Sequence, residues 1–94
     1  MWVVRGDSGD VVARAEGGVM WTAAFADLNP VQFPMVWALT PCGDAVFNQR
    51  QVQLLVSELD RLPAACGGDW VGQARELCRV VERGTHLYLW FLGD

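Results

Sequence analysis

Apolar and polar positions in this 94-residue chain follow strand-like patterns near both ends and helical patterns in the second half. Near the start, the valine-rich runs Trp2 to Arg5 and Val11 to Ala15 are separated by five residues, including Gly6 and Gly9. Valine favours strands, whereas glycine, aspartate and serine favour tight turns. The pattern therefore predicts an N-terminal β-hairpin.

A long amphipathic helix is predicted to begin after Asn48 and to end before Pro63. Asn48 can accept hydrogen bonds from the first free amides of the helix, and Gln51 completes a variant of the capping box. Phe47 and Val52 occupy the two positions of a hydrophobic staple. One face of this helix is apolar and contains Val52, Leu55, Val56, Leu59 and Leu62.

A second helix is predicted to follow Gly67 and Gly68, with Asp69 as its cap and Gly84 in a left-handed conformation at its end. The last segment, residues 85–92, is apolar at both sets of alternating positions. A strand covered on both faces has this pattern, so we place the segment inside a sheet, with Trp90 in the core.

The segment from Gly17 to Gln49 carries only two charged residues, Asp27 and Asp44. Within it, Trp21 to Leu28 has helical spacing over one or two turns. Three prolines then interrupt the chain and favour extended or turn geometry at the residue before each. Met35 to Leu39 is predicted to be a third strand.

These elements together predict a single α+β domain over residues 1–94. Its small antiparallel sheet would contain the N-terminal hairpin and the buried C-terminal strand, with the two main helices packed on one face. A chain of this length has room for one hydrophobic core.

Composition narrows the classes of partner. Seven arginines and eleven acidic residues give a net charge of −4, and lysine and isoleucine are absent. This usage is typical of a GC-rich genome and suggests a bacterial source. Nucleic acids and anionic membranes bind to clustered cations, so neither is expected as a partner.

Three cysteines cannot all pair within one chain, and no secretory signal pattern is visible, so we expect a cytoplasmic protein.

Two blocks carry a resemblance. Residues 41–48 contain a P-x-G-D-x-V-F-N pattern, and residues 86–94 contain an H-L-Y-L-x-F-x-G-D pattern. These blocks resemble a group of small, uncharacterised bacterial proteins, and the likeness spans most of the chain. Members of that group tend to have an aromatic residue at the position of Cys42 and threonine at that of Ala45. The resemblance therefore implies no activity and argues against Cys42 as a shared nucleophile.

The residues that suit catalysis are few. His86 is the only histidine, and it can act as a base near neutral pH. An alternative functional hypothesis is a small enzyme that uses His86 with Asp44 or Cys42. The structural interpretation is that His86 opens a buried strand, Asp44 bonds within a turn and Cys42 is a small hydrophobe.

No metal or cofactor is expected. Cys42, Cys66, Cys78 and His86 are ligand types that zinc accepts, but structural zinc sites usually take two ligands from one tight turn. The pair Gly67 and Gly68 lacks the spacing of a phosphate-binding loop. These residues therefore predict packing and turn formation rather than ligand binding.

The main functional hypothesis comes from the aromatic residues. A domain this small buries only a little over ~60% of its unfolded surface, so some large side chains between residues 20 and 47 are expected at a surface. We therefore expect a non-enzymatic protein-binding module, either of the inhibitor or immunity type or self-associating. The expected contact residues are Met20, Trp21, Asp27, Phe33, Trp37 and Asp44. A further alternative is a small-molecule sensor with an aromatic pocket.

Overall fold

The computed structural model describes residues 1–93, and Asp94 lies outside the described residues. Its four strands are β1 (Trp2–Gly6), β2 (Val11–Ala15), β3 (Asp44–Phe47) and β4 (Leu87–Leu92). Its α-helices are α1 (Pro34–Trp37), α2 (Gln49–Asp60) and α3 (Asp69–Arg83). Two 3-10 helices complete the fold, η1 (Ala23–Asp27) and η2 (Ala64–Cys66).

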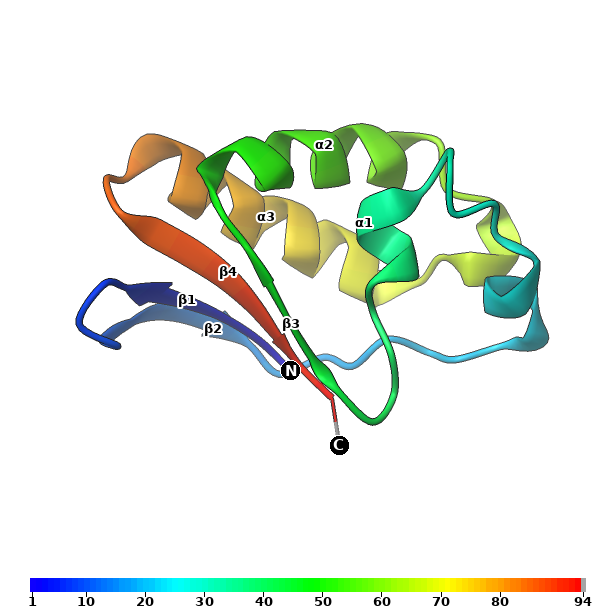
Figure 1. Cartoon of the computed structure of the whole chain (residues 1–94). Helices are drawn as coiled ribbons and strands as arrows, with labels where there is room; N and C mark the ends of the chain where they lie inside the picture. Colours follow the sequence, from blue (N-terminus) through cyan, green and yellow to red (C-terminus); the bar gives the residue numbers. More distant parts are fainter. Residues whose placement is uncertain (94) are drawn as a thin grey trace.

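The strands form one antiparallel sheet in the order β2-β1-β4-β3. The helices α2 and α3 lie side by side over one face of this sheet (Figure 1). This arrangement confirms the predicted α+β fold. It also confirms the hairpin and the inner position of the C-terminal strand, because β4 pairs with β1 on one side and β3 on the other.

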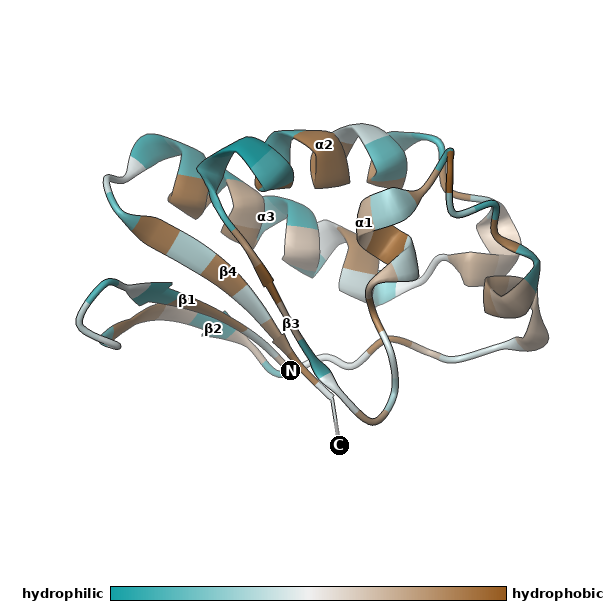
Figure 2. Cartoon of the chain, viewed as in Figure 1, coloured by the Kyte–Doolittle hydropathy of each residue, from teal (hydrophilic) through white to brown (hydrophobic). Residues whose placement is uncertain are grey.

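The core lies between the helices and the sheet. Trp2 of β1 stacks on Trp70 of α3, with ring centroids 6.2 Å apart, and meets Phe91 of β4 at 4.8 Å. Leu55 of α2 and Leu89 of β4 are completely buried. Figure 2 shows the corresponding apolar positions of α2, α3 and β4. Trp2 and Val4 of β1 and the apolar faces of α2 and α3 therefore meet in one interior, whereas Val3 is buried on the other face of the sheet.

The cap of α2 has the predicted form. The Asn48 side chain accepts hydrogen bonds from the backbone amides of Arg50 and Gln51, at 3.0 and 2.9 Å. The Gln51 side chain in turn accepts from the Asn48 amide at 2.8 Å. Phe47 and Val52, which flank this box, are both buried. A local sequence signal thus fixes where β3 ends and α2 begins.

The ends of α3 differ from the prediction. Gly68 is the cap position, and Asp69 is the first helical residue, where its charge favours the helix N-terminus without a capping hydrogen bond. Gly84 is extended, with φ −96° and ψ −179°, instead of left-handed. The left-handed residue is His86, at φ 56°, just before β4. Histidine tolerates this conformation better than most side chains.

The predicted strand Met35 to Leu39 is wrong, because this region contains the short helix α1. Pro34 occupies its first turn, where a missing N–H costs nothing. The third strand is instead β3, which follows the Pro41 loop and pairs with β4. The sequence pattern misses β3 because the strand has only four residues. It misses α1 because this helix depends on a side chain that is distant in the sequence, that of Glu58.

The expectation that β4 is covered on both faces is also wrong. Helices cover the face that carries Leu89 and Phe91, whereas the opposite face of the sheet has no covering element among the described residues. Tyr88 and Trp90 lie on that open face and are half-buried rather than in the core. The Arg5 guanidinium shields the Trp90 ring, with its central carbon 4.9 Å from the ring centroid.

Candidate functional site

The segment predicted to contact a partner lies beside the sheet rather than within it. In Figure 1, residues 20–40 occupy the cyan-to-teal part of the chain, next to one end of the helix layer. The segment is held there at several points. The Thr22 hydroxyl donates to the carbonyl of Ala65 at 3.1 Å, and Leu28, Phe33 and Val36 reach the core.

A cavity of about 310 Å³ opens between η1, α1 and the Pro41 loop. We call it the aromatic groove, and its bulky lining residues are Trp21, Phe25, Leu28, Trp37, Leu39 and Pro41. Among the described residues of the lining, Thr40 supplies the only polar side chain besides the indole N–H groups of the two tryptophans. The site is therefore suited to an apolar group and offers little hydrogen bonding to a polar one.

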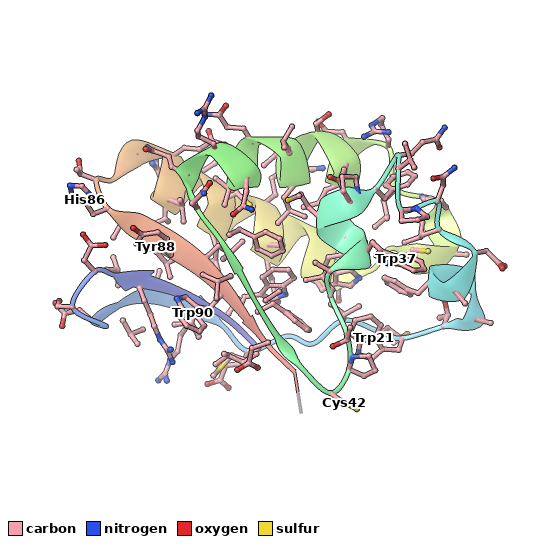
Figure 3. All side chains as sticks on the ribbon, in the orientation of Figure 1. Trp21, Trp37, Cys42, His86, Tyr88 and Trp90 are labelled. Atoms are coloured by element: carbon pink, nitrogen blue, oxygen red, sulfur yellow. The ribbon has the colours of Figure 1, made fainter. Side chains whose placement is uncertain are left out.

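Two of the expected contact residues form walls of this groove. Trp21 is half-buried and packs against Phe25, with ring centroids 5.0 Å apart. Trp37, on the short helix α1, is 48% exposed. Figure 3 shows Trp21 and Trp37 at the same end of the molecule. Met20, at 72% exposed, precedes Trp21 along the chain.

Phe33 does not belong to this surface, because it is only 8% exposed and packs in the core. Its ring is covered from outside by Arg61, whose guanidinium carbon lies 5.0 Å from the ring centroid. The same guanidinium donates to the carbonyl of Gln32 at 3.0 Å. Pro34 predicts extended or turn geometry at Phe33, but it also starts helix α1, and Phe33 at the cap position of that helix points into the core.

The two acidic residues have different surroundings. Asp27 is exposed at the end of η1, between the groove residues Ala26 and Leu28. Asp44 is also exposed, but it lies on the open face of the sheet at the start of β3. Its carboxylate accepts a hydrogen bond from the Gly93 amide at 3.2 Å. Asp27 therefore stands at the rim of the groove, and Asp44 has the structural role of joining a turn to the end of β4.

The residue that positions α1 was not anticipated from the sequence. Glu58 of α2 is 2% exposed, and its carboxylate accepts from the amides of Met35 and Val36 at 3.0 Å. It thereby satisfies amides at the start of α1 that have no partner within the helix. A negative charge is also favourable at that end. Glu58 looks like an ordinary helix-surface acid in the sequence, so its only signal was a position on the inner side of α2.

The structure does not bring together the residues of the enzyme hypothesis. Asp44 pairs with Leu92 at one end of β4, whereas His86 precedes the other end. Leu92 is six positions after His86 along the strand, which corresponds to about 20 Å. Cys42 lies at the same end as Asp44, and Figure 3 shows His86 and Cys42 at opposite ends of the sheet. Proton transfer needs hydrogen-bond or single-water reach, so neither pairing of His86 can act as a catalytic couple.

The three cysteines are also separated. Cys42 is exposed, whereas Cys66 and Cys78 are buried. Burial raises the pKa of the Cys78 thiol to about 12 and, together with the charge of Asp27, raises the pKa of Cys66. Among residues 1–93, no three or more His, Cys, Asp or Glu side chains gather as metal ligands do.

A second cluster, also missed from the sequence, lies on the open face of the sheet. Asp7 from the β1–β2 turn approaches His86, with 3.5 Å between the carboxylate and the imidazole Nδ1. The pKa of Tyr88 is raised by a hydrogen bond to Asp7 and by the charge of that carboxylate. These residues meet because β1 pairs with β4, and nothing in the local sequence around Asp7 indicates the contact.

Comparison with known proteins adds no function to this geometry. No protein-family model matches the chain, and neither a curated protein nor a solved structure matches it significantly. The helices within residues 1–93 are all too short or too polar to cross a membrane. The resemblance of the two sequence blocks stays a prediction, and the candidate sites rest on their own chemistry.

Proposed function

We propose that this protein is a non-enzymatic binding module that docks on a basic protein partner through the aromatic groove. The observation that carries the proposal is the groove itself, a 310 Å³ apolar hollow walled by two tryptophans, one of them half exposed. Tryptophan is enriched among the residues that dominate binding energy at protein interfaces. A bulky apolar side chain of the partner would insert between Trp21 and Trp37.

The groove is supported on several sides, which favours binding. Glu58 holds the backbone of α1, and Trp21 packs on Phe25 and, at 6.1 Å between centroids, on Phe91. Side chains that are already ordered lose less conformational entropy on association. The groove can therefore give affinity with a modest contact area.

Charge defines the kind of partner. None of residues 1–93 that line the groove is basic, Asp27 stands at its rim, and the whole chain has a net charge of −4. Charge complementarity sets orientation and association rate at such interfaces. The partner should therefore present lysine or arginine beside its apolar anchor. An inhibitor or immunity-type protein that neutralises a basic partner is one form of this function.

Paired baits test the proposal. Wild-type protein, Trp37→Ala and Leu54→Ala are immobilised and exposed to extract of the source cell. Leu54 is 54% exposed on the outer side of α2, so it is a matched control for loss of an exposed apolar side chain. We expect a basic protein to bind to wild type and to Leu54→Ala, to elute with salt, and to be lost with Trp37→Ala. Equal capture by the two variants would contradict the proposal.

Self-association through the same groove is the outcome to exclude first. Size-exclusion chromatography with light scattering gives the molar mass of the purified protein, for comparison with 10.4 kDa for one chain. Our proposal predicts a monomer in the absence of partner. A stable dimer that Trp37→Ala dissociates would show that the groove is occupied by a second copy.

A second candidate function is the binding of a small apolar molecule in the groove. The volume of about 310 Å³ lies at the lower end of the range for ligand pockets. Such a ligand would change the fluorescence of Trp21 and Trp37, so a screen of small apolar compounds by tryptophan emission separates this candidate from protein docking.

A further inference from the structure

The open face of the sheet contains a second hollow, of about 330 Å³, that is chemically unlike the groove. We call it the sheet-face hollow, and the residues that characterise it are Arg5, Asp7, Val46, Tyr88 and Trp90. They come from β1, the β1–β2 turn, β3 and β4. The hollow therefore combines one positive group, one negative group and an apolar floor.

Arg5 provides a prepared cation. Its guanidinium lies over the Trp90 ring, and the pairing of β1 with β4 places Arg5 opposite Tyr88. Neither an ion pair nor a side-chain hydrogen bond joins Arg5 to another of residues 1–93. Stacking on an aromatic ring leaves the planar donors of arginine available to a carboxylate.

Asp7 provides the opposite charge. Its carboxylate lies 3.5 Å from the Nδ1 of His86, and Tyr88 lines the same hollow. An ionised carboxylate accepts several hydrogen bonds, so this one retains capacity for a donor from a ligand. A purely anionic ligand would meet repulsion from Asp7, and a purely cationic one would meet repulsion from Arg5.

The apolar surfaces lie between these charges. Val46 of β3 is 43% exposed, and the half-buried rings of Tyr88 and Trp90 are its neighbours across β4. Figure 3 shows His86 just before β4, followed by Tyr88 and Trp90 along the strand. A ligand that satisfies the whole hollow must carry a carboxylate for Arg5, an ammonium for Asp7 and an apolar body for Val46 and the rings.

We infer that the sheet-face hollow binds a small zwitterion with an apolar side chain, of which a free aromatic or aliphatic α-amino acid is the simplest member. The carboxylate lies against Arg5, the ammonium against Asp7 and the side chain against Val46. This site is on the opposite side of the sheet from the core and does not depend on the proposed docking at the aromatic groove.

The sequence supplies two unique reporters for a test. His86 is the only histidine and Tyr88 the only tyrosine, so their ring signals in a proton NMR spectrum need no assignment by mutation. Three matched probes are titrated: phenylalanine, N-acetylphenylalanine without the ammonium, and phenethylamine without the carboxylate. We expect saturable shifts of both rings with phenylalanine and affinities about tenfold weaker for each truncated probe.

Variants locate the binding. Arg5→Met and Asp7→Asn should each weaken phenylalanine binding about tenfold, whereas Arg14→Gln, a charge removed from β2 outside the hollow, should leave it unchanged. Amide dispersion shows whether each variant is folded, and Arg5→Gln, which also removes the positive charge, replaces Arg5→Met if that variant unfolds. The inference is overturned if phenylalanine gives no saturable shift, if the three probes bind equally, or if Asp7→Asn and the arginine variant bind as wild type does.

Discussion

On the helix-covered face of the sheet, Leu89 and Phe91 of β4 are buried, whereas on the opposite face their neighbours Tyr88 and Trp90 are only partly buried. All four side chains are apolar or aromatic, so hydropathy does not separate the two faces. The side chains that lie beside them on the neighbouring strand β1 do distinguish the two faces. The covered face adds Trp2 and Val4 from β1, whereas the open face adds Arg5 and Val3, which its neighbours bury without help from a helix. A strand that looks buried on both sides can therefore have one side that faces solvent and ligands.

The largest expected difference between the two faces is in the stability of alanine variants of Leu89 and Trp90, which are adjacent in β4. Leu89→Ala should lower the free energy of unfolding by roughly 2–5 kcal/mol, because it leaves a cavity in a fully covered core. Trp90→Ala removes more atoms but should cost less, about 1–2 kcal/mol, because the ring is only partly buried and lies beside Arg5, Val3 and Val46 on a face that no helix covers. Urea denaturation of both variants measures the two values. An equal or larger loss for Trp90→Ala would show that the open face is covered in solution.

The next largest effect is expected where a charge lies on the covered side. Glu58→Ala should cost about 2–3 kcal/mol, because it leaves the amides of Met35 and Val36 without their charged acceptor. Glu58→Gln keeps one carbonyl oxygen and should cost less. Thermal unfolding of the two variants gives the ranking. If both Glu58 variants are as stable as wild type, the carboxylate does not hold α1.

A smaller effect is expected at the start of α2. Asn48→Ala removes a side chain that accepts two amide hydrogen bonds and should cost about 1 kcal/mol. Asn48→Ser keeps a capping oxygen and should cost a fraction of that. Chemical denaturation resolves the difference, and a loss for serine as large as that for alanine would rule out capping as the cause.

The smallest effect concerns the open face and is read as a pKa. The carboxylate of Asp7 raises the pKa of Tyr88 above its ordinary value of 10.0, so Asp7→Asn should move the phenol titration to lower pH. Because the folded pKa is raised, the stabilisation from this contact is complete below the unfolded pKa and is lost as pH rises through the folded one. Ultraviolet absorbance of the single tyrosine follows the titration. An unchanged titration midpoint in Asp7→Asn would show that the Asp7 carboxylate does not affect the Tyr88 phenol.

Elements with local signals could be predicted from the sequence. The hairpin follows from two valine runs around a turn, and α2 follows from an Asn48 cap and an apolar face, both of which are confirmed. The prolines were less informative. Pro34 marks a helix start as readily as a chain break, and the helix that it starts depends on Glu58, 23 residues from Met35 along the chain. A contact between residues so far apart in the sequence leaves no periodic pattern of apolar and polar positions.

The candidate sites divide in the same way. The excess of aromatic residues before Phe47 predicted a surface, and Trp37 and Met20 are exposed, but the sequence did not separate them from buried Phe33. The sheet-face hollow was not predicted, because Arg5 and Asp7 meet Tyr88 only through the pairing of the first strand with the last. Which side of an all-apolar strand receives the helices is decided by the whole sheet rather than by the strand itself.

Photo-crosslinking from Cys42 tests the proposed docking most directly. Cys42 follows the groove residue Pro41 and is exposed, whereas Cys66 and Cys78 are buried with raised pKa values, so a maleimide label reacts selectively there. A control carries the label on the outer face of α2, in a Gln53→Cys, Cys42→Ser variant. We predict a crosslink to one basic protein from Cys42, its loss with Trp37→Ala, and none from the control. The same products from both labelled positions, or none from either, would contradict docking at the aromatic groove.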